Sequence, residues 1–268
     1  MSVDLCVVTY NNRPHIERLL ETLFNTIHEV HPVTQDDAWW LHIADNGSTD
    51  GTREYLDSVS RRFHFDSLVY NNNVGYAEAC NQLAAMGNCD NIALLNGDVW
   101  FTSQNVVDLD RFLRTHSDVA VVGPKSRNEA CQINHAGIDG TNERPYHRSW
   151  MKEDVGDVFH RDVVPMVSVS GSAFFVNRSI WNELKDCPIY QSLHPGAGAF
   201  LPTRHYYEET WFAYHARAHG YNVMYNGEVS IGHTWHASSP VGGEADKEFQ
   251  VSRAMFREAC DAHGILRD

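Results

Sequence analysis

The chain has 268 residues, of which 43% are hydrophobic and 21% charged, and its net charge is −14 at pH 7. This composition is typical of a soluble globular protein with one large core, and we expect a single domain with elaborations. The negative charge, together with the lack of any run of Lys and Arg, disfavours a nucleic acid as the partner.

Cysteine spacing and hydropathy restrict the class further. The six cysteines are scattered without a close pair, which is typical of small core residues in a reducing compartment and disfavours both structural zinc and a disulfide framework. No apolar stretch approaches the ~20 residues of a transmembrane helix, and no secretory signal precedes the first predicted strand. We therefore expect a cytoplasmic protein with no transmembrane segment.

The first half of the chain alternates predicted strands and helices. Apolar runs predict strands at residues 3–9, 39–45, 67–70 and 119–122 and one ending at Asp98, whereas helical periodicity predicts helices near residues 16–27, 55–56, 75–86 and 106–113. This βαβαβαβ order predicts an α/β fold with a Rossmann-like, doubly wound, mostly parallel sheet flanked by helices.

The second half is less regular. Residues 128–164 are polar and are interpreted as a long excursion outside the core that forms a lid or binding loop. Beyond them we expect a strand over 167–176 interrupted by Gly171, helices over 179–184 and 208–219, strands over 223–225 and 229–231, and a terminal helix over 244–263.

Residues 91–100 (NIALLNGDVW) are an apolar run that ends in a carboxylate. Open parallel sheets bind ligands beyond the carboxyl ends of their strands, so Asp98 is expected where a metal or a phosphate would bind. The alternative is an ordinary turn, because Asn, Gly and Asp are common turn residues.

Several motifs occur in an order that resembles the family 2 glycosyltransferases of the GT-A fold, especially their rhamnosyltransferase-like and galactofuranosyltransferase-like branch. The motifs are 7–14 (VVTYNNRP), 44–52 (ADNGSTDGT), 73–81 (NVGYAEACN), 94–99 (LLNGDV), 169–174 (VSGSAF), 207–211 (YEETW), 218–221 (AHGY) and His233. The resemblance implies one GT-A domain over residues 1–239, with a nucleotide-binding half (1–124) and an acceptor half (125–239), followed by a helical extension (240–268).

The resemblance implies an inverting, metal-dependent glycosyltransferase of the hexosyltransferase type. It would move a sugar from a UDP- or dTDP-sugar to a hydroxyl of a glycan, a lipid-linked saccharide or a protein. A divalent cation would neutralise the departing diphosphate, and Mn²⁺ tolerates an imidazole ligand better than Mg²⁺ does. Asp98 and His233 are the implied metal ligands, with His236 as the fallback, although a lone His is more often structural in a chain with 16 histidines.

The chain departs from the family pattern at three places. Asn96 replaces the first acid of the Asp-x-Asp motif, Glu208-Glu209 stands where Glu-Asp is common, and Trp211 replaces a further Asp. We predict Glu209 as the general base that deprotonates the acceptor, with Glu208 next, and Trp211 as a contact of the sugar or acceptor. The alternative for the two acids is that they only offset the helix dipole.

The resemblance also implies a nucleotide pocket. In it, Asp45 accepts a hydrogen bond from the N3–H of uracil or thymine, and Tyr10 stacks on the base or simply fills space. The pocket would be completed by Thr9, Asn11, Asn46, Gly75 and Asn96. Gly75 has an equally good structural explanation as a glycine after a strand.

The donor sugar would lie against the backbone at Gly171 and Ser172. The acceptor would be read by residues 128–164 and 193–206.

Two other functions compete with this one. A sugar-1-phosphate nucleotidyltransferase would carry a Gly-x-Gly-Thr-Arg type loop after the first strand, and residues 9–13 are TYNNR instead. A non-catalytic nucleotide-sugar-binding relic of a transferase would bind the donor without turning it over.

Overall fold

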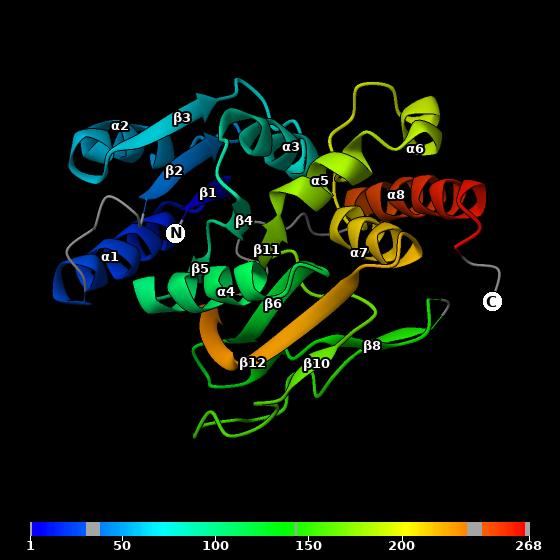
Figure 1. Cartoon of the computed structure of the whole chain (residues 1–268). Coiled ribbons are helices and arrows are strands. Elements are labelled where there is room, and N and C mark those ends of the chain that lie inside the picture. The colour runs from blue at the N-terminus through cyan, green and yellow to red at the C-terminus, as the bar shows by residue number, and fades with distance from the viewer. Residues whose placement is uncertain (1, 31–37, 143, 235–242, 266–268) are drawn as a thin grey trace.

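The computed structural model describes residues 2–30, 38–142, 144–234 and 243–265. Ten described strands form one central sheet in the order β10-β12-β6-β11-β4-β1-β2-β3, with β5 paired to β12 and β7 to β6 (Figure 1). The strands of this sheet are β1 (Ser2–Thr9), β2 (Ala38–Asp45), β3 (Phe65–Val69), β4 (Asn91–Asn96), β5 (Val99–Trp100), β6 (Val119–Arg127), β7 (Ile133–His135), β10 (Val163–Pro165), β11 (Ala173–Asn177) and β12 (Asn222–His233). A separate hairpin consists of β8 (Ile138–Gly140) and β9 (Pro145–His147).

Helices cover both faces of the sheet. They are α1 (Arg13–Val30), α2 (Thr52–Phe63), α3 (Tyr76–Met86), α4 (Ser103–Thr115), α5 (Arg178–Lys185), α6 (Pro188–Leu193), α7 (Glu208–Ala218) and α8 (Gly243–Ala262). Buried side chains of α1, α2 and α4 form one core with one face of the sheet. Those of α3, α5, α6, α7 and α8 form a second core with the other face. Two cores on either side of one sheet are the expected result of an apolar sheet with helices on both faces.

The nucleotide-binding half follows the predicted topology. β4, β1, β2 and β3 are neighbours and all pair in parallel, with helices as the connections between successive strands. β1 and β4 are buried almost throughout, as expected for strands covered on both faces. The α/β, mostly parallel prediction is therefore confirmed.

The succession of parallel strands is interrupted beside β6. β11 lies between β4 and β6 and runs antiparallel to both. It also begins only at Ala173, so residues 167–172 are not part of a strand. The predicted strands 223–225 and 229–231 are one strand, β12, with a shift of register between Asn226 and Ser230.

The polar segment 128–164 is not wholly an excursion. β7 pairs with β6, β10 pairs with β12, and the side chains of Ile133, Ala136 and Ile138 belong to the second core. The segment therefore supports the end of the sheet. The sequence did not indicate these apolar contacts, because most residues of the segment are polar.

The C-terminal helix α8 packs on α6 and α7, and its Phe256, Ala259 and Cys260 are buried in the second core (Figure 1). All six cysteines are free thiols. None of the helices within the described ranges is long and apolar enough to cross a membrane.

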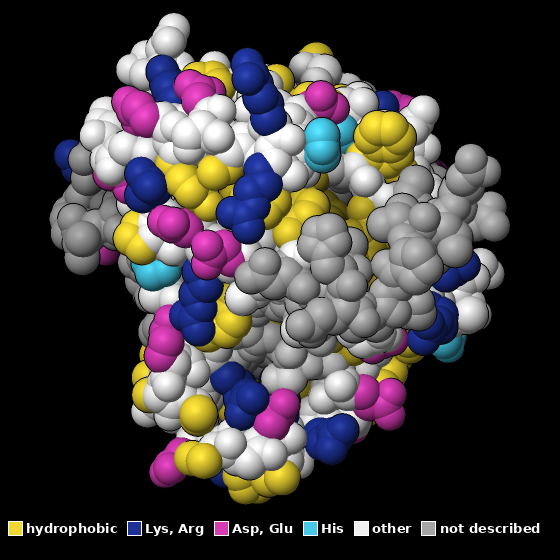
Figure 2. Space-filling view, turned by 90° about the vertical axis from the view of Figure 1, so that its left-hand side faces the viewer, with side chains coloured by type: hydrophobic (Ala, Val, Ile, Leu, Met, Phe, Trp, Pro, Cys, Tyr) yellow, Lys and Arg dark blue, Asp and Glu magenta, His cyan; other side chains and the backbone are white. Residues whose placement is uncertain are grey.

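The surface that lies on the left-hand side of Figure 1, where α1 and α2 are found, carries acidic and basic side chains in alternation (Figure 2). Among the charged side chains of α1 and α2, Arg18 pairs with Glu129 and Arg53 with the buried Asp45. The net negative charge therefore does not produce a patch of one sign on the visible part of this face.

Candidate functional site

Asp98 lies in the turn between β4 and β5. β5 pairs with the end of β12, which places His233 opposite Val99. The two strands approach closely because residue 232 is a glycine: a Cβ there would lie 1.7 Å from the Trp100 ring. The fold therefore brings the last residue of β12 to the turn that carries Asp98.

The side chains of Asp98 and His233 meet inside the protein. The distance between Asp98 Oδ1 and His233 Nε2 is 3.3 Å, and the residues are only 4% and 6% exposed. The Thr234 amide donates to the Asp98 carbonyl at 3.0 Å, and Asn134 Nδ2 donates to the His233 carbonyl at 2.8 Å. Asn134 comes from β7. The sequence did not indicate that this segment supports the site.

This pair fits one edge of a metal coordination sphere. Adjacent ligands of an octahedral ion at 2.0–2.1 Å are roughly 3 Å apart, close to the observed separation. The donors are one carboxylate oxygen and one imidazole nitrogen, a set that suits Mn²⁺. His236, the fallback ligand, lies outside the described residues.

Asp45 ends β2 and is 1% exposed. Its Oδ1 accepts from the Ser48 amide at 3.2 Å and its Oδ2 from Arg53 Nε at 3.0 Å. Arg53 also donates to the Tyr70 carbonyl at 2.7 Å. Asp45 thus orders the loop that follows β2, while each carboxylate oxygen keeps a further lone pair for a ligand.

Other predicted nucleotide-binding residues tie the loops together. Asn46 accepts from the Val74 amide at 2.9 Å and donates to the Gly75 carbonyl at 3.3 Å. Asn11 accepts from the Thr49 amide at 2.7 Å, and the Thr9 hydroxyl bonds to the side chain of Asn12. The network joins the carboxyl ends of β1 and β2 to the loop before α3.

Gly75 has a structural reason of its own. Its φ is +96°, and a Cβ would lie 2.8 Å from the Arg204 carbonyl oxygen. Any side chain here would push apart the loop before α3 and the segment before α7. Tyr10 and Asn96, by contrast, are only partly buried.

Gly171 and Glu209 lie side by side. A Cβ on Gly171 would be 3.4 Å from Glu209 Cβ and Cγ. The Tyr76 hydroxyl donates to the Gly171 carbonyl at 2.8 Å, a contact that no sequence motif indicated. Ser172 is buried, and its carbonyl accepts from the Asn96 amide at 3.0 Å. This bond connects the Gly171 segment to the turn that carries Asp98.

The two glutamates begin α7 after a strained backbone. Tyr206 and Tyr207 both have φ of +71°, an uncommon conformation for bulky residues that is often found at functional sites. Glu208 is buried, and the Thr203 hydroxyl donates to its Oε2 at 3.3 Å. Burial and the neighbouring Glu209 raise the pKa of Glu208 to about 8.

Glu209 is more accessible than Glu208 and remains half-buried. Burial raises the pKa of Glu209 as well. Because like charges on neighbouring carboxylates oppose each other, the two side chains favour holding one proton between them.

The structure does not place Trp211 at this site. Trp211 is 0% exposed and stacks between the rings of Tyr190, at 5.4 Å, and His215, at 4.6 Å. It therefore packs in the second core, and the prediction that it contacts sugar or acceptor is wrong in this conformation.

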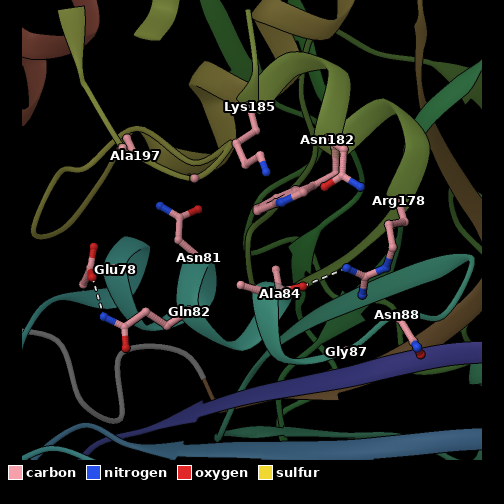
Figure 3. Close-up of a pocket in the computed structure, with 14 residues that line it drawn as sticks. Glu78, Asn81, Gln82, Ala84, Gly87, Asn88, Arg178, Asn182, Lys185 and Ala197 are labelled. Atoms are coloured by element: carbon pink, nitrogen blue, oxygen red, sulfur yellow. Dashed lines mark hydrogen bonds between the residues drawn. The ribbon is translucent and has the colours of Figure 1, made fainter.

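A separate pocket of about 570 Å³ lies between α3, α5 and the segment near Gly196 (Figure 3). Its main cation, Arg178, is already paired: it donates to Asp4 at 2.6 Å and to the Ala84 carbonyl at 2.8 Å. None of the residues that line this pocket is a predicted catalytic, nucleotide-binding or metal-binding residue, although Gly196, Ala197 and Gly198 belong to the segment predicted to read the acceptor.

Comparisons with known proteins identify the family of the chain. The family model described as "Glycosyl transferase family 2" matches residues 4–175. Abequosyltransferase RfbV of Salmonella typhimurium is 27% identical over 156 residues, which cover 58% of this chain and 42% of that protein. The chain thus spans less than half the length of this curated relative.

Solved structures share the fold at low identity. GalNAc-T7 with UDP, GalNAc and Mn²⁺ has a TM-score of 0.67 at 12% identity, covering 97% of this chain and 50% of that one. Staphylococcus aureus TarS with UDP has 0.59 at 14%, covering 97% and 65%. A mannosyltransferase of Pyrobaculum calidifontis with GDP-Man and Mn²⁺ has 0.59 at 13%, covering 98% and 72%.

The family match extends over more than half of the chain, and the sheet with its flanking helices has the architecture of these structures. The chain belongs to glycosyl transferase family 2 and has the GT-A fold.

Proposed function

We propose that this protein is an inverting, metal-dependent glycosyltransferase of the hexosyltransferase type, and that it transfers a sugar from a UDP- or dTDP-sugar to an acceptor hydroxyl. The observation that carries the proposal is the buried Asp98–His233 pair at the end of β4 and β12. The Asn96–Ser172 hydrogen bond joins the turn that carries this pair to the segment beside Glu209.

Asp98 and His233 would hold the divalent cation. When bound, the cation neutralises the negative charge that develops on the departing nucleoside diphosphate. The structures of GalNAc-T7 and of the mannosyltransferase contain Mn²⁺, which supports the same kind of ion here. The imidazole of His233 favours Mn²⁺ over Mg²⁺.

Glu209 would act as the general base. Its carboxylate takes the proton from the acceptor hydroxyl as that oxygen bonds to the anomeric carbon, while the bond to the diphosphate breaks on the opposite face. Glu208 would keep its proton, and Glu209 would then be the ionised carboxylate of the two. The missing side chain at Gly171 leaves room beside Glu209 for the donor sugar.

Asp45 would recognise the pyrimidine, in a pocket completed by Tyr10 and Asn96. UDP in two of the similar structures supports a uridine donor, whereas the mannosyltransferase carries GDP-Man. The partial match to an abequosyltransferase supports sugar transfer as the activity. The proposal includes membership of the rhamnosyltransferase-like or galactofuranosyltransferase-like branch. Residues 128–164 and 193–206 would recognise the acceptor. Because its six cysteines are free thiols, the protein would work in a reducing, cytoplasmic setting.

A panel of nucleotide sugars tests this function. We expect one uridine or thymidine sugar, in the presence of Mn²⁺, to raise the melting temperature and to release its nucleoside diphosphate. A ligand at 100 times its Kd stabilises a fold by about 2.7 kcal/mol, which is readily measured. Asn96 in place of an acid favours one alternative function, the non-catalytic relic. Such a protein would bind the nucleotide sugar without releasing the nucleoside diphosphate. Release of pyrophosphate from a nucleoside triphosphate and a sugar phosphate would indicate a nucleotidyltransferase.

A further inference from the structure

Three helical elements bring a thiol and two imidazoles together away from Asp98. Cys187 precedes α6, His215 lies in α7, and His263 follows α8. One potential ligand atom from each lies within 4.8 Å of the others. Cys187 and His215 are buried, and His263 is half-buried.

His263 is oriented as a ligand. Its Nδ1–H donates to the Ala259 carbonyl at 2.8 Å, so its Nε2 carries the lone pair. That Nε2 accepts a hydrogen bond from the Cys187 thiol, with Sγ at 3.7 Å, and a metal ion would replace the thiol proton. A tetrahedral zinc ion with Zn–S of about 2.3 Å and Zn–N of about 2.0–2.1 Å separates these two donors by about 3.6 Å. A second imidazole nitrogen bonded to a backbone carbonyl is also the usual arrangement around a metal-bound histidine.

His215 is the most deeply buried of the three side chains. It is 1% exposed, and within the described part of the chain neither of its ring nitrogens has a hydrogen-bond partner. The plain alternative is aromatic packing, because His215 also stacks on Trp211 at 4.6 Å.

We propose that Cys187, His215 and His263 form a binding site for Zn²⁺, with water as the fourth ligand. The donor set of one sulfur and two nitrogens selects a softer ion than the carboxylate and imidazole of Asp98 and His233. The site does not depend on the proposed transferase activity. The sequence did not indicate this site, because residues 187, 215 and 263 are far apart in the chain and only the fold brings them together.

The ion would clamp the C-terminal helix to the rest of the second core. α8 contacts α6 and α7, and the three ligands belong to the ends or the body of these helices. His215 is six residues after Glu209, or about 9 Å along the helix axis, so the ion would not touch the reacting groups. Its expected effect is on the stability of α8 and α7.

Cobalt substitution in the full chain, stripped of metal with a chelator, tests the site. Co²⁺ bound by a thiolate and two imidazoles in tetrahedral geometry gives visible d–d bands and a near-ultraviolet thiolate-to-cobalt band. We expect one Co²⁺ per chain with both features, and displacement of Co²⁺ by Zn²⁺. Zn²⁺ should also raise the melting temperature.

Variants decide between a metal site and packing alone. Cys187→Ser should lose the thiolate band, and His263→Gln, at a half-buried helix end, should weaken Co²⁺ binding at least tenfold. The matched controls Cys131→Ser and His116→Gln should behave as wild type. A wild-type protein that gives no thiolate band, or a Cys187→Ser variant that keeps it, would show that the cluster is aromatic packing only.

Discussion

His233 Nε2 lies 3.3 Å from Asp98 Oδ1, although one residue ends β12 and the other follows β4. The β5–β12 pairing makes this contact, and Asn134 and the Thr234 amide fix the backbone on either side of it. The proposed metal site rests on this buried carboxylate and imidazole, which lie together at the ends of parallel strands.

Replacing Asp98 should abolish metal-dependent donor binding without unfolding the protein. Asp98→Ala removes a carboxylate ligand from a turn and leaves the apolar core untouched. Calorimetry with UDP should show that Mn²⁺ strengthens binding in the wild type and has no effect in the variant, while circular dichroism stays unchanged. Asp108→Ala, which removes a carboxylate from α4 at the surface, is the matched control.

Replacing His233 should change which metal is preferred. His233→Gln exchanges an imidazole for an amide oxygen, a ligand type better suited to Mg²⁺. Donor affinity in Mn²⁺ should fall roughly tenfold or more, and the advantage of Mn²⁺ over Mg²⁺ should shrink. Titration of each metal at fixed UDP measures this, with the exposed His116→Gln as control. An unchanged preference for Mn²⁺ would remove His233 from the site.

The sequence predicted the parallel half of the fold well because its signals are local: an apolar strand, a turn and an amphipathic helix repeat in order. The sequence predicted a strand near β11 but not its antiparallel insertion between β4 and β6, because that insertion depends on contacts distant in sequence. Motif order indicated Asp98, His233 and Glu209, and the structure brings the first two into contact.

Trp211 was misplaced because a motif position does not reveal which way a helical side chain points. Most of α7 is buried, so its periodicity could not separate a face toward the site from a face toward the core. Tyr76 and Asn134 gave no signal either, since their contacts with Gly171 and His233 cross nearly 100 residues.

Asp45 should give a preference for pyrimidine nucleotides. A buried acceptor that meets the N3–H of uracil or thymine is left unpaired by other bases, so UDP or dTDP should bind more tightly than GDP and ADP. Asp45→Asn should reduce this preference roughly tenfold. Arg53→Gln is the control, because it breaks the same ion pair but keeps the carboxylate. Equal or tighter GDP binding by the wild type would contradict the assignment.

Glu209→Gln should lower turnover by ~10² or more with little change in donor affinity, because the amide keeps the size of the side chain but cannot accept the proton. Glu208→Gln should be milder, since the proposed state of Glu208 is already neutral. NMR of the product should show an inverted anomeric configuration. Near-normal transfer by Glu209→Gln beside an inactive Glu208→Gln would move the base by one residue, and a retained configuration would reject a single displacement.

The raised pKa of Glu208 should appear in the pH dependence of stability. The folded protein holds this proton to about pH 8, whereas an ordinary glutamic acid has a pKa near 4.5. The folded state therefore binds more protons between these two pH values, and the free energy of unfolding should fall as the pH rises through this window, by about 1.4 kcal/mol per pH unit. Urea unfolding of wild type and Glu208→Gln at several pH values measures the difference. Parallel curves would show that Glu208 titrates normally.

The most direct test of the account is Mn²⁺-dependent release of nucleoside diphosphate from the donor found in the panel, measured for the wild type, Asp98→Ala and Glu209→Gln under the same conditions. The account predicts that the wild type binds and turns over the donor, that Asp98→Ala does neither, and that Glu209→Gln binds it but hardly turns it over. Wild-type turnover by Asp98→Ala, with the same dependence on Mn²⁺, would contradict the proposed metal site.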